Sequence, residues 1–468
     1  MSVPERFTNI DEYLSVAFDI LRTYSWIYRE PNVSCIKSID RMPDDFKRFF
    51  LSLPNESLNK FPFVHESFTD CPPTILRFRQ EISHLTPRQT LFQSLLPDRK
   101  HNKITRVETQ NRKMGPKKLH EIEKFADHIY KHSPNTEMVI DLGSGLGYLS
   151  EALIKLNKKY LILGLEADGQ RVKTARQRIK HLLPEESYDL ISYEKLFITS
   201  DAHSRDFIER HTFELAKASG LRQSTAFSTA LIGLHACADL SIDAMLLFLE
   251  MPNARSLHLM PCCYHKISVS NAQADFPFYN FPLSASFRNA LSANAPQVYL
   301  NRPFMRLACQ QTISRWRCEY ALHVKHGTQM FLRGLAEYLC DTDELVMMKR
   351  KKNIFTPPAS LGLDDVQQRF QLHSRHTGQQ VPWRPFHNKR LIEISKRYTL
   401  EQGCCLAEAL CCLQASIQQL CENLVLLDRL CYLNDVATSK HLRIEAWYEK
   451  LLDEELSPRC RVLVAKKL

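Results

Sequence analysis

The stretch MVIDLGSGLGY, residues 138–148, decides the fold. An apolar run predicts a buried strand that ends near Asp141, and the chain then turns through Gly143, Gly145 and Gly147. The whole chain of 468 residues holds only 13 glycines, so three within one pentapeptide indicate a backbone requirement. We expect a tight turn that opens into a helix, whose first N–H groups are free to meet a ligand.

Apolar runs continue to alternate with helical patterns on both sides of this stretch. The strands that we expect are residues 138–140, 160–165, 196–199, 230–234 and 256–260. Helices are expected from Pro116, since proline suits the first helical position, and then over residues 148–156 and 170–183. Such alternation predicts an α/β fold with a doubly wound, mostly parallel sheet.

The spacing of the glycines distinguishes two classes of cofactor. A dinucleotide-binding loop has the pattern G-x-G-x-x-G, but Tyr148 stands where its third glycine would lie. The pattern D-x-G-x-G-x-G resembles instead the first motif of class I S-adenosylmethionine-dependent methyltransferases. The resemblance implies a Rossmann-like sheet that binds S-adenosyl-L-methionine. The cofactor-binding residues that it implies at the loop are Asp141, Gly143, Ser144, Gly145 and Gly147.

Two further acidic residues follow at expected strand ends. Glu166 ends the second strand, where a carboxylate can accept hydrogen bonds from both ribose hydroxyls. Asp201 follows the third strand, near the expected place of the adenine, and Ala202 is next to it. We predict that all three border the cofactor. The alternative is that Glu166 and Asp201 only cap helices.

The fourth and fifth expected strands end in an unusual set of polar residues. These candidates for the substrate pocket are His235, Cys237, Asp239, Cys262, Cys263 and Tyr264. Three interpretations are open. His235 or Asp239 positions the methyl acceptor or takes its proton. Alternatively, the cysteines and histidines bind zinc, or the cysteines only pack the edge of the sheet. Because the spacing matches no zinc finger or ribbon, the sequence predicts no metal site. The Asn-Pro-Pro-Tyr type of motif, which serves methylation of amino groups on bases, is absent.

The whole chain is expected to consist of four segments. Residues 1–113 are predicted to form a helical N-terminal region, 114–300 the core, 301–440 a mainly helical insertion, and 441–468 the closing strands of a seven-stranded sheet. A heptad-like apolar stripe follows Gly403, from Leu406 to Cys431. We expect the stripe to pack inside its own domain, and a dimer seam is the alternative. The oligomeric state stays undefined.

The chain is basic, with a formal net charge of +10. Between Asp98 and Lys118, eight basic residues face only two acidic ones. The strip from Arg99 to Lys118 therefore predicts contact with RNA phosphates, and a solvated helix face is the alternative.

Cysteine usage and the N-terminus indicate a compartment. The 15 cysteines include three adjacent pairs, which are not typical of a disulfide framework, so we expect a reducing environment. The N-terminus has no apolar signal region. The sequence also has no run of about 20 uncharged apolar residues, so we expect no membrane contact. We expect an intracellular protein, cytoplasmic or nuclear. The run KRKK at 349–352 is consistent with a nuclear signal or with a solvated loop.

Taken together, these segments resemble the methyltransferase-like protein 25 family, whose relatives are named for a ribosomal RNA adenine dimethylase domain. The matching pieces are MGPKK at 114–118, the glycine loop, LHACADL at 234–240, CCY at 262–264, LSPR at 456–459 and VLVAK at 462–466. Ala238 departs from the glycine that is usual in that family. The resemblance implies a class I methyltransferase with a helical insertion before its final hairpin. We expect RNA as substrate, with a protein substrate or a non-catalytic binding protein of the same fold as the alternatives.

Overall fold

The computed structural model describes residues 3–87, 114–220, 227–271, 275–292, 296–310, 316, 320–340, 344–350 and 362–468. The chain divides into two compact units. The first unit combines Met1–Leu14, Pro87–Pro296 and Glu422–Leu468, and the second combines Ser15–Thr86 and Gln297–Cys421. The N-terminal region and most of the predicted insertion thus share one unit, whereas residues 422–439 group with the sheet. Most of the basic strip, residues 99–113, lies outside the described residues, as do residues 351–352.

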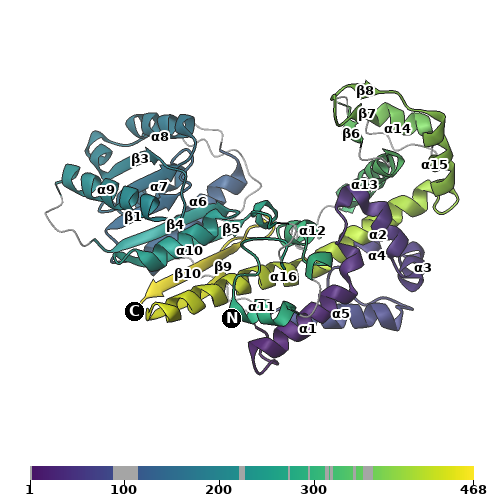
Figure 1. Ribbon diagram of the computed structural model, residues 1–468, viewed down its shortest axis with the longest axis horizontal. Coiled ribbons are helices and arrows are strands. Elements are labelled where there is room, and N and C mark those ends of the chain that lie inside the picture. The colour runs from purple at the N-terminus through teal and green to yellow at the C-terminus, as the bar shows by residue number, and fades with distance from the viewer. Residues whose placement is uncertain are drawn as a thin grey trace. The chain divides into compact units, whose positions relative to one another are not determined.

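Seven strands form the sheet of the first unit, in the order β3-β2-β1-β4-β5-β10-β9 (Figure 1). Their bounds are β1 Met138–Leu142, β2 Leu161–Glu166, β3 Ile191–Lys195, β4 Thr229–Cys237, β5 Ala254–Cys262, β9 Ile444–Lys450 and β10 Arg461–Lys467. The first five strands pair in parallel, and β10 pairs antiparallel with both β5 and β9. This confirms the predicted Rossmann-like class I methyltransferase sheet with its closing hairpin.

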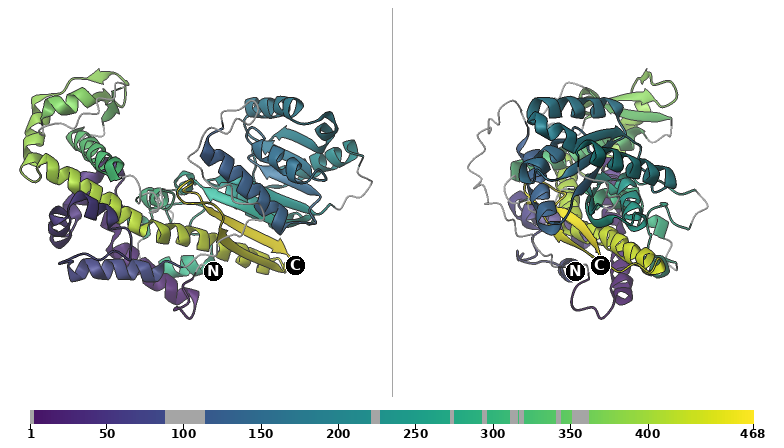
Figure 2. Two further views of the ribbon diagram at one scale, coloured as in Figure 1. Left: turned by 180° about the vertical axis from the view of Figure 1, so that it is seen from behind. Right: turned by 90° about the vertical axis from the view of Figure 1, so that its left-hand side faces the viewer.

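Helices cover both faces of this sheet (Figure 2). Their bounds are α6 Pro116–His132, α7 Tyr148–Leu156, α8 Gly169–Leu182, α9 Ala202–Ala218 and α10 Leu240–Glu250. The short helix α11, Ala285–Leu291, lies beside α16, Leu400–Ser439, where Asp428 accepts a hydrogen bond from the N–H of Ser284. β1 and β2 are buried along their whole length, as the apolar runs predict. One core joins Phe125 of α6, Val139, Ile162 and Ile232 of the central strands, and Val464 of β10.

One predicted strand is wrong. Residues 196–199 are not a strand, and the third strand is β3, Ile191–Lys195. β3 lies at the edge of the sheet, so only alternate residues, Ile191 and Tyr193, are buried. Alternation with Ser192 and Glu194 hides such a strand from a search for continuous apolar runs.

The second unit is mainly helical, as predicted for both segments that compose it. Its elements are α2 Cys35–Arg41, α3 Asp44–Ser52, α4 Asn55–Lys60, α5 Pro73–Leu85, α12 Arg302–Leu307, α13 Tyr320–Cys340, α14 Leu363–Arg369 and α15 Pro385–Ser395. A small antiparallel sheet, β6 Leu345–Lys349, β7 Phe370–Ser374 and β8 Gln380–Val381, was not predicted. The boundary between the units falls within α1, Ile10–Thr23, and within α16, Leu400–Ser439.

α16 carries the apolar stripe. Every member from Leu406 to Leu427 is buried within this chain, which confirms the intramolecular packing that we expected. By length and composition alone α16 is apolar enough to cross a membrane, but 78% of its most apolar window is buried inside the protein, as in a core helix.

Candidate active site

The glycine loop connects β1 directly to α7. Gly143, Gly145 and Gly147 have φ angles of +80°, +57° and +75°, in the left-handed region that favours glycine. The N–H groups of Gly143 and Ser144 both donate to the carbonyl of Leu165, at 2.9 Å. Backbone bonds to β2 therefore hold the loop in shape.

The glycines differ in what a side chain would meet. A Cβ atom at Gly147 would lie 2.1 Å from the hydroxyl oxygen of Tyr193, so internal packing requires glycine there. A Cβ atom at Gly145 would approach nothing closer than the carbonyl of Gly143, at 4.0 Å. Gly145 thus borders open space, where a ligand can come close to the backbone.

Asp141 lies at the end of β1 and is only 2% exposed. Its Oδ2 atom has no hydrogen-bond partner among the described residues. Burial, and then the charge of Glu166, raises the pKa of Asp141 to about 7. A buried carboxylate with an unpaired oxygen is well suited to a cationic ligand group.

Glu166 ends β2 and faces the glycine loop. Its carboxylate accepts hydrogen bonds from the N–H groups of Gly145 and Asp168, both at 3.1 Å. The helix cap of α8 is Asp168, which accepts from the N–H groups of Gln170 and Arg171. Glu166 is therefore not a helix cap, and its carboxylate is placed beside the open side of the loop.

Asp201, in contrast, does cap a helix. It accepts a hydrogen bond from the N–H of Ser204 at 2.8 Å, and this bond is the main reason why its pKa is lowered. Ala202 begins α9 and is exposed. In the loop after β3, Phe197 is 78% exposed, and its neighbour Leu196 donates its N–H to the carbonyl of Glu166. The sequence prediction missed this exposed ring because it placed Phe197 inside a buried strand.

His235 lies in the last part of β4 with a φ of +63°, unusual for a residue other than glycine. Its Nε2 lies 3.1 Å from the carboxylate of Glu121, which is 3% exposed and also accepts from the hydroxyl of Ser457 at 2.7 Å. Burial would raise the pKa of Glu121, but the bonds to His235 and Ser457 outweigh it and the pKa is lowered. No spacing in the sequence indicated Glu121, because it looks like a polar member of α6.

Asp239 is occupied by structural bonds. It accepts from the N–H and the hydroxyl of Ser268, at 3.1 and 2.8 Å, and from the side-chain amide of Asn280, at 2.6 Å. These bonds tie the chain after β5 to the end of β4. The two predicted acid–base candidates therefore differ. His235 contacts Glu121 through Nε2, and its Nδ1 remains available to accept a proton.

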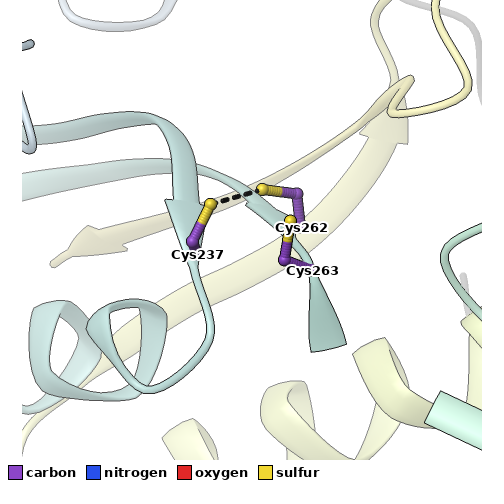
Figure 3. A group of neighbouring side chains, drawn as sticks. All are labelled: Cys237, Cys262 and Cys263. Carbon is purple, nitrogen blue, oxygen red and sulfur yellow. Dashed lines mark hydrogen bonds between the residues drawn. The ribbon is translucent and has the colours of Figure 1, made fainter. Parts of the chain in front are cut away.

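Three cysteines meet where β4 and β5 end (Figure 3). Cys237 pairs in register with Cys262, and their sulfur atoms lie 3.0 Å apart. The hydrogen bond from Cys262 lowers the pKa of the Cys237 thiol and raises that of Cys262. Every described cysteine is a free thiol, and the sulfurs of Cys237, Cys262 and Cys263 lie within 4.8 Å of one another.

Tyr264 lies behind this group rather than in an open pocket. It is 1% exposed, and its hydroxyl lies 3.3 Å from the Glu422 carboxylate and from the carbonyl of Pro261. The guanidinium of Arg429, from α16, lies 4.9 Å from the centre of its ring. Tyr264 therefore supports the end of β5 from inside the first unit.

A groove beside α8 is lined by no residue of the glycine loop. It is lined by residues of α8, β3 and α9, among them Lys173, Lys180, Lys195 and Phe207. Arg176 and Glu194 of the groove pair with each other at 2.9 Å, whereas the three lysines form no ion pair with the part of the chain that the structure describes, so the groove presents positive charge to solvent.

Residues 117–270 match a family model described as a methyltransferase domain. This match supports methyltransferase activity and S-adenosyl-L-methionine as the cofactor. The methyltransferase domain spans α6 to the segment after β5, and thus holds the glycine loop, Glu166, His235 and the three cysteines.

Several solved structures are similar over part of the chain. The glycopeptide N-methyltransferase MtfA complexed with sinefungin is 15% identical, over 29% of this chain and 48% of that chain, with a TM-score of 0.20. The same enzyme with S-adenosyl-L-methionine is 14% identical, over 30% and 53%, with a TM-score of 0.21. The methyltransferase domain of bacterial CtHen1-CN is 20% identical, over 30% and 65%, with a TM-score of 0.21. The chain therefore spans about half the length of the MtfA structures.

Proposed function

We propose that the first unit binds S-adenosyl-L-methionine at the glycine loop and transfers its methyl group to an acceptor at the carboxyl ends of β4 and β5. The observation that carries this proposal is the bond from the Gly145 N–H to the Glu166 carboxylate. It sets an acidic side chain against the open side of a glycine turn, at the ends of two adjacent parallel strands. Ligands of doubly wound folds bind at that edge.

The residues at the loop fit this cofactor chemically. Asp141 offers a buried carboxylate oxygen without a partner, which suits the cationic methionine part. Glu166 offers a carboxylate that can accept from ribose hydroxyls in place of backbone N–H groups. Gly145 leaves the approach to the backbone open. When bound, the cofactor supplies a methyl group on a positively charged sulfur, which is a good leaving group.

His235 is placed to handle the acceptor's proton. Its bond to the buried Glu121 carboxylate puts the ring proton on Nε2, which leaves Nδ1 as a base. Nδ1 would accept the acceptor's proton as the acceptor takes the methyl group that the bound cofactor supplies, and the cofactor's sulfur would keep the bonding electron pair. Glu121 then stabilises the imidazolium, and Ser457 holds Glu121 in place.

Calorimetry of the intact chain with S-adenosylhomocysteine tests cofactor binding. We expect one site per chain and weaker binding in Asp141→Ala, because the buried anion is lost. Asp168→Ala is the matched control: it removes a carboxylate from the same edge that caps only α8. Absence of binding by the unmodified chain, or equal loss in both variants, would refute the proposal.

We propose RNA as the acceptor. Support comes from the basic strip of the sequence, from Arg99 to Lys118, and from the unpaired lysines in the groove beside α8. The resemblance to the methyltransferase-like protein 25 family agrees with this choice. Binding through phosphates falls steeply with salt, with a slope that decreases by about one for each lysine removed.

Incubation with radiolabelled cofactor and cell extract identifies the acceptor. Label in RNA supports the proposal, and label confined to polypeptide favours a protein methyltransferase. Cofactor binding without label in any fraction favours a non-catalytic binding protein. Salt-insensitive binding of RNA would refute the phosphate contacts.

A further inference from the structure

We propose that Cys237, Cys262 and Cys263 form a zinc site with three thiolate ligands and an open fourth position. Nothing in the spacing of these residues predicts a metal, and the site exists only where β4 and β5 end side by side (Figure 3). Zinc content and the cobalt spectrum are measured without methyl transfer, so the two proposals can fail separately.

The geometry brings the three sulfurs to one point. Cys237 and Cys262 are direct neighbours on parallel strands. Successive residues of a strand point to opposite faces, so Cys263 would normally turn away from Cys262. Instead, Cys263 has a φ of +50°, and this turn out of the strand brings its sulfur to the same side, as Figure 3 shows.

The distances match a tetrahedral zinc site after small shifts. Zinc–sulfur bonds of about 2.3 Å place ligand sulfurs about 3.8 Å apart. Here Cys237 and Cys262 lie 3.0 Å apart, and all three sulfurs lie within 4.8 Å of one another. The 3.0 Å separation is much longer than a disulfide bond of about 2.05 Å. Each thiol would release its proton to solvent as its bond to zinc forms.

The position of the cluster leaves room for a fourth ligand. Cys237 and Cys263 are partly exposed, unlike cysteines that only fill a core. Among the described residues, the group contains no fourth histidine, cysteine or carboxylate. Three protein ligands with one open position are typical of catalytic zinc. A Cβ atom at Gly143 would lie 3.3 Å from Leu240, so the segment after Cys237 borders the glycine loop.

A buried cation behind the cluster is a second, independent observation. Three thiolates and one Zn²⁺ carry a net negative charge, which needs compensation in a protein interior. Arg429 is 2% exposed, interacts electrostatically with Cys262, and its Nη1 has no hydrogen-bond partner among the described residues. The carboxylates of Asp428 and Asp239 also interact with this guanidinium, and a zinc–thiolate group beside Cys262 would add a further negative charge near it.

Cobalt substitution tests the site directly. The intact chain is purified under reducing conditions without chelator, its zinc content is measured, and the metal is then exchanged for Co²⁺. We expect one zinc per chain and a sulfur-to-cobalt charge-transfer absorption with the intensity of three thiolates and the visible bands of tetrahedral coordination. No metal in the purified chain together with no cobalt spectrum would overturn the proposal, as would a Cys237–Cys262 disulfide found by mass spectrometry in anaerobically prepared protein.

Single variants assign the ligands. Loss of a residue that only hydrogen-bonds a metal ligand lowers metal affinity by about 10- to 100-fold. Cys237→Ser and Cys263→Ser should each weaken zinc binding by more than that, because each removes a ligand. Cys431→Ser is the control, since Cys431 is a partly buried cysteine of α16 outside the cluster. Urea denaturation shows whether each variant is folded, and a folded Cys237→Ser variant with unchanged zinc affinity would overturn the assignment. His235→Gln should leave the cobalt spectrum unchanged, and loss of the spectrum would overturn the open fourth position.

Discussion

Replacing Gly145 with alanine tests whether the glycine loop holds a ligand, because the new methyl group enters open space in the ligand-free protein. The nearest atom to its Cβ would be 4.0 Å away, so no packing is disturbed. The remaining cost is the left-handed backbone, with a φ of +57°. For alanine that costs about 1 kcal/mol of unfolding free energy.

Gly220→Ala is the matched control. Gly220 has a φ of +69° at the end of α9, and its Cβ would meet nothing within 4 Å. Urea denaturation should therefore show the same loss of about 1 kcal/mol for both variants. Only at Gly145 does the methyl group occupy space that the proposed cofactor needs. Crowding of a packed contact costs about 1–3 kcal/mol, or about 5- to 150-fold in affinity.

Calorimetry with S-adenosylhomocysteine measures that difference. Gly220→Ala should bind as the unmodified chain does, and Gly145→Ala should bind at least about fivefold more weakly. Unchanged affinity in a folded Gly145→Ala variant would show that the open side of the loop is not the ligand site. A much larger loss of stability at Gly145 than at Gly220 would show that the space is not open.

Three further outcomes follow from the same geometry. Burial raises the pKa of Asp141 from 3.8 to about 7, because the buried carboxyl group is more stable when it is protonated. The free energy of unfolding is therefore highest below about pH 4 and falls as the pH rises through about 7. In urea titrations, Asp141→Asn should stabilise the ligand-free chain by up to about 4 kcal/mol at about pH 8, and by much less near pH 4. Gly147→Ala should cost about 1–3 kcal/mol more than Gly145→Ala because its Cβ would lie 2.1 Å from the Tyr193 hydroxyl, and adding Tyr193→Phe should recover part of that loss in the same measurement. His235→Gln should slow methyl transfer by about 100-fold while calorimetric affinity for S-adenosylhomocysteine stays the same; equal losses in both would contradict a proton-transfer role.

Much of the cofactor edge was predictable because its determinants are local. A glycine turn between a strand and a helix needs positive φ angles, and Gly143, Gly145 and Gly147 record that need in the sequence. Continuous apolar runs identify β1 and β2, which are buried on both faces. The same search failed at β3, because an edge strand buries only one face and reads as an alternating pattern. That error also hid Phe197, which becomes a loop residue only when β3 ends at Lys195.

The acceptor edge was not predictable to the same degree because its contacts join distant segments. Glu121 meets His235 across 114 positions and Ser457 across 336, so no window of sequence contains the group. Asp201 and Asp239 looked alike as acidic residues at strand ends. The structure shows that both are structural: Asp201 caps a helix by accepting from Ser204, and Asp239 anchors a loop by accepting from Ser268.

The sequence by itself determined the strand–turn–helix unit around the three glycines, since backbone conformation and the period of apolar residues are local properties of a chain. It also determined the alternation that leads to a parallel sheet. The pairing of Cys237 with Cys262, the turn at Cys263 and the burial of Arg429 behind them were decided only by tertiary structure. The physical reason is that strand register and helix packing depend on how the whole core is buried. The spacing of the cysteines along the chain therefore does not indicate which of them become neighbours.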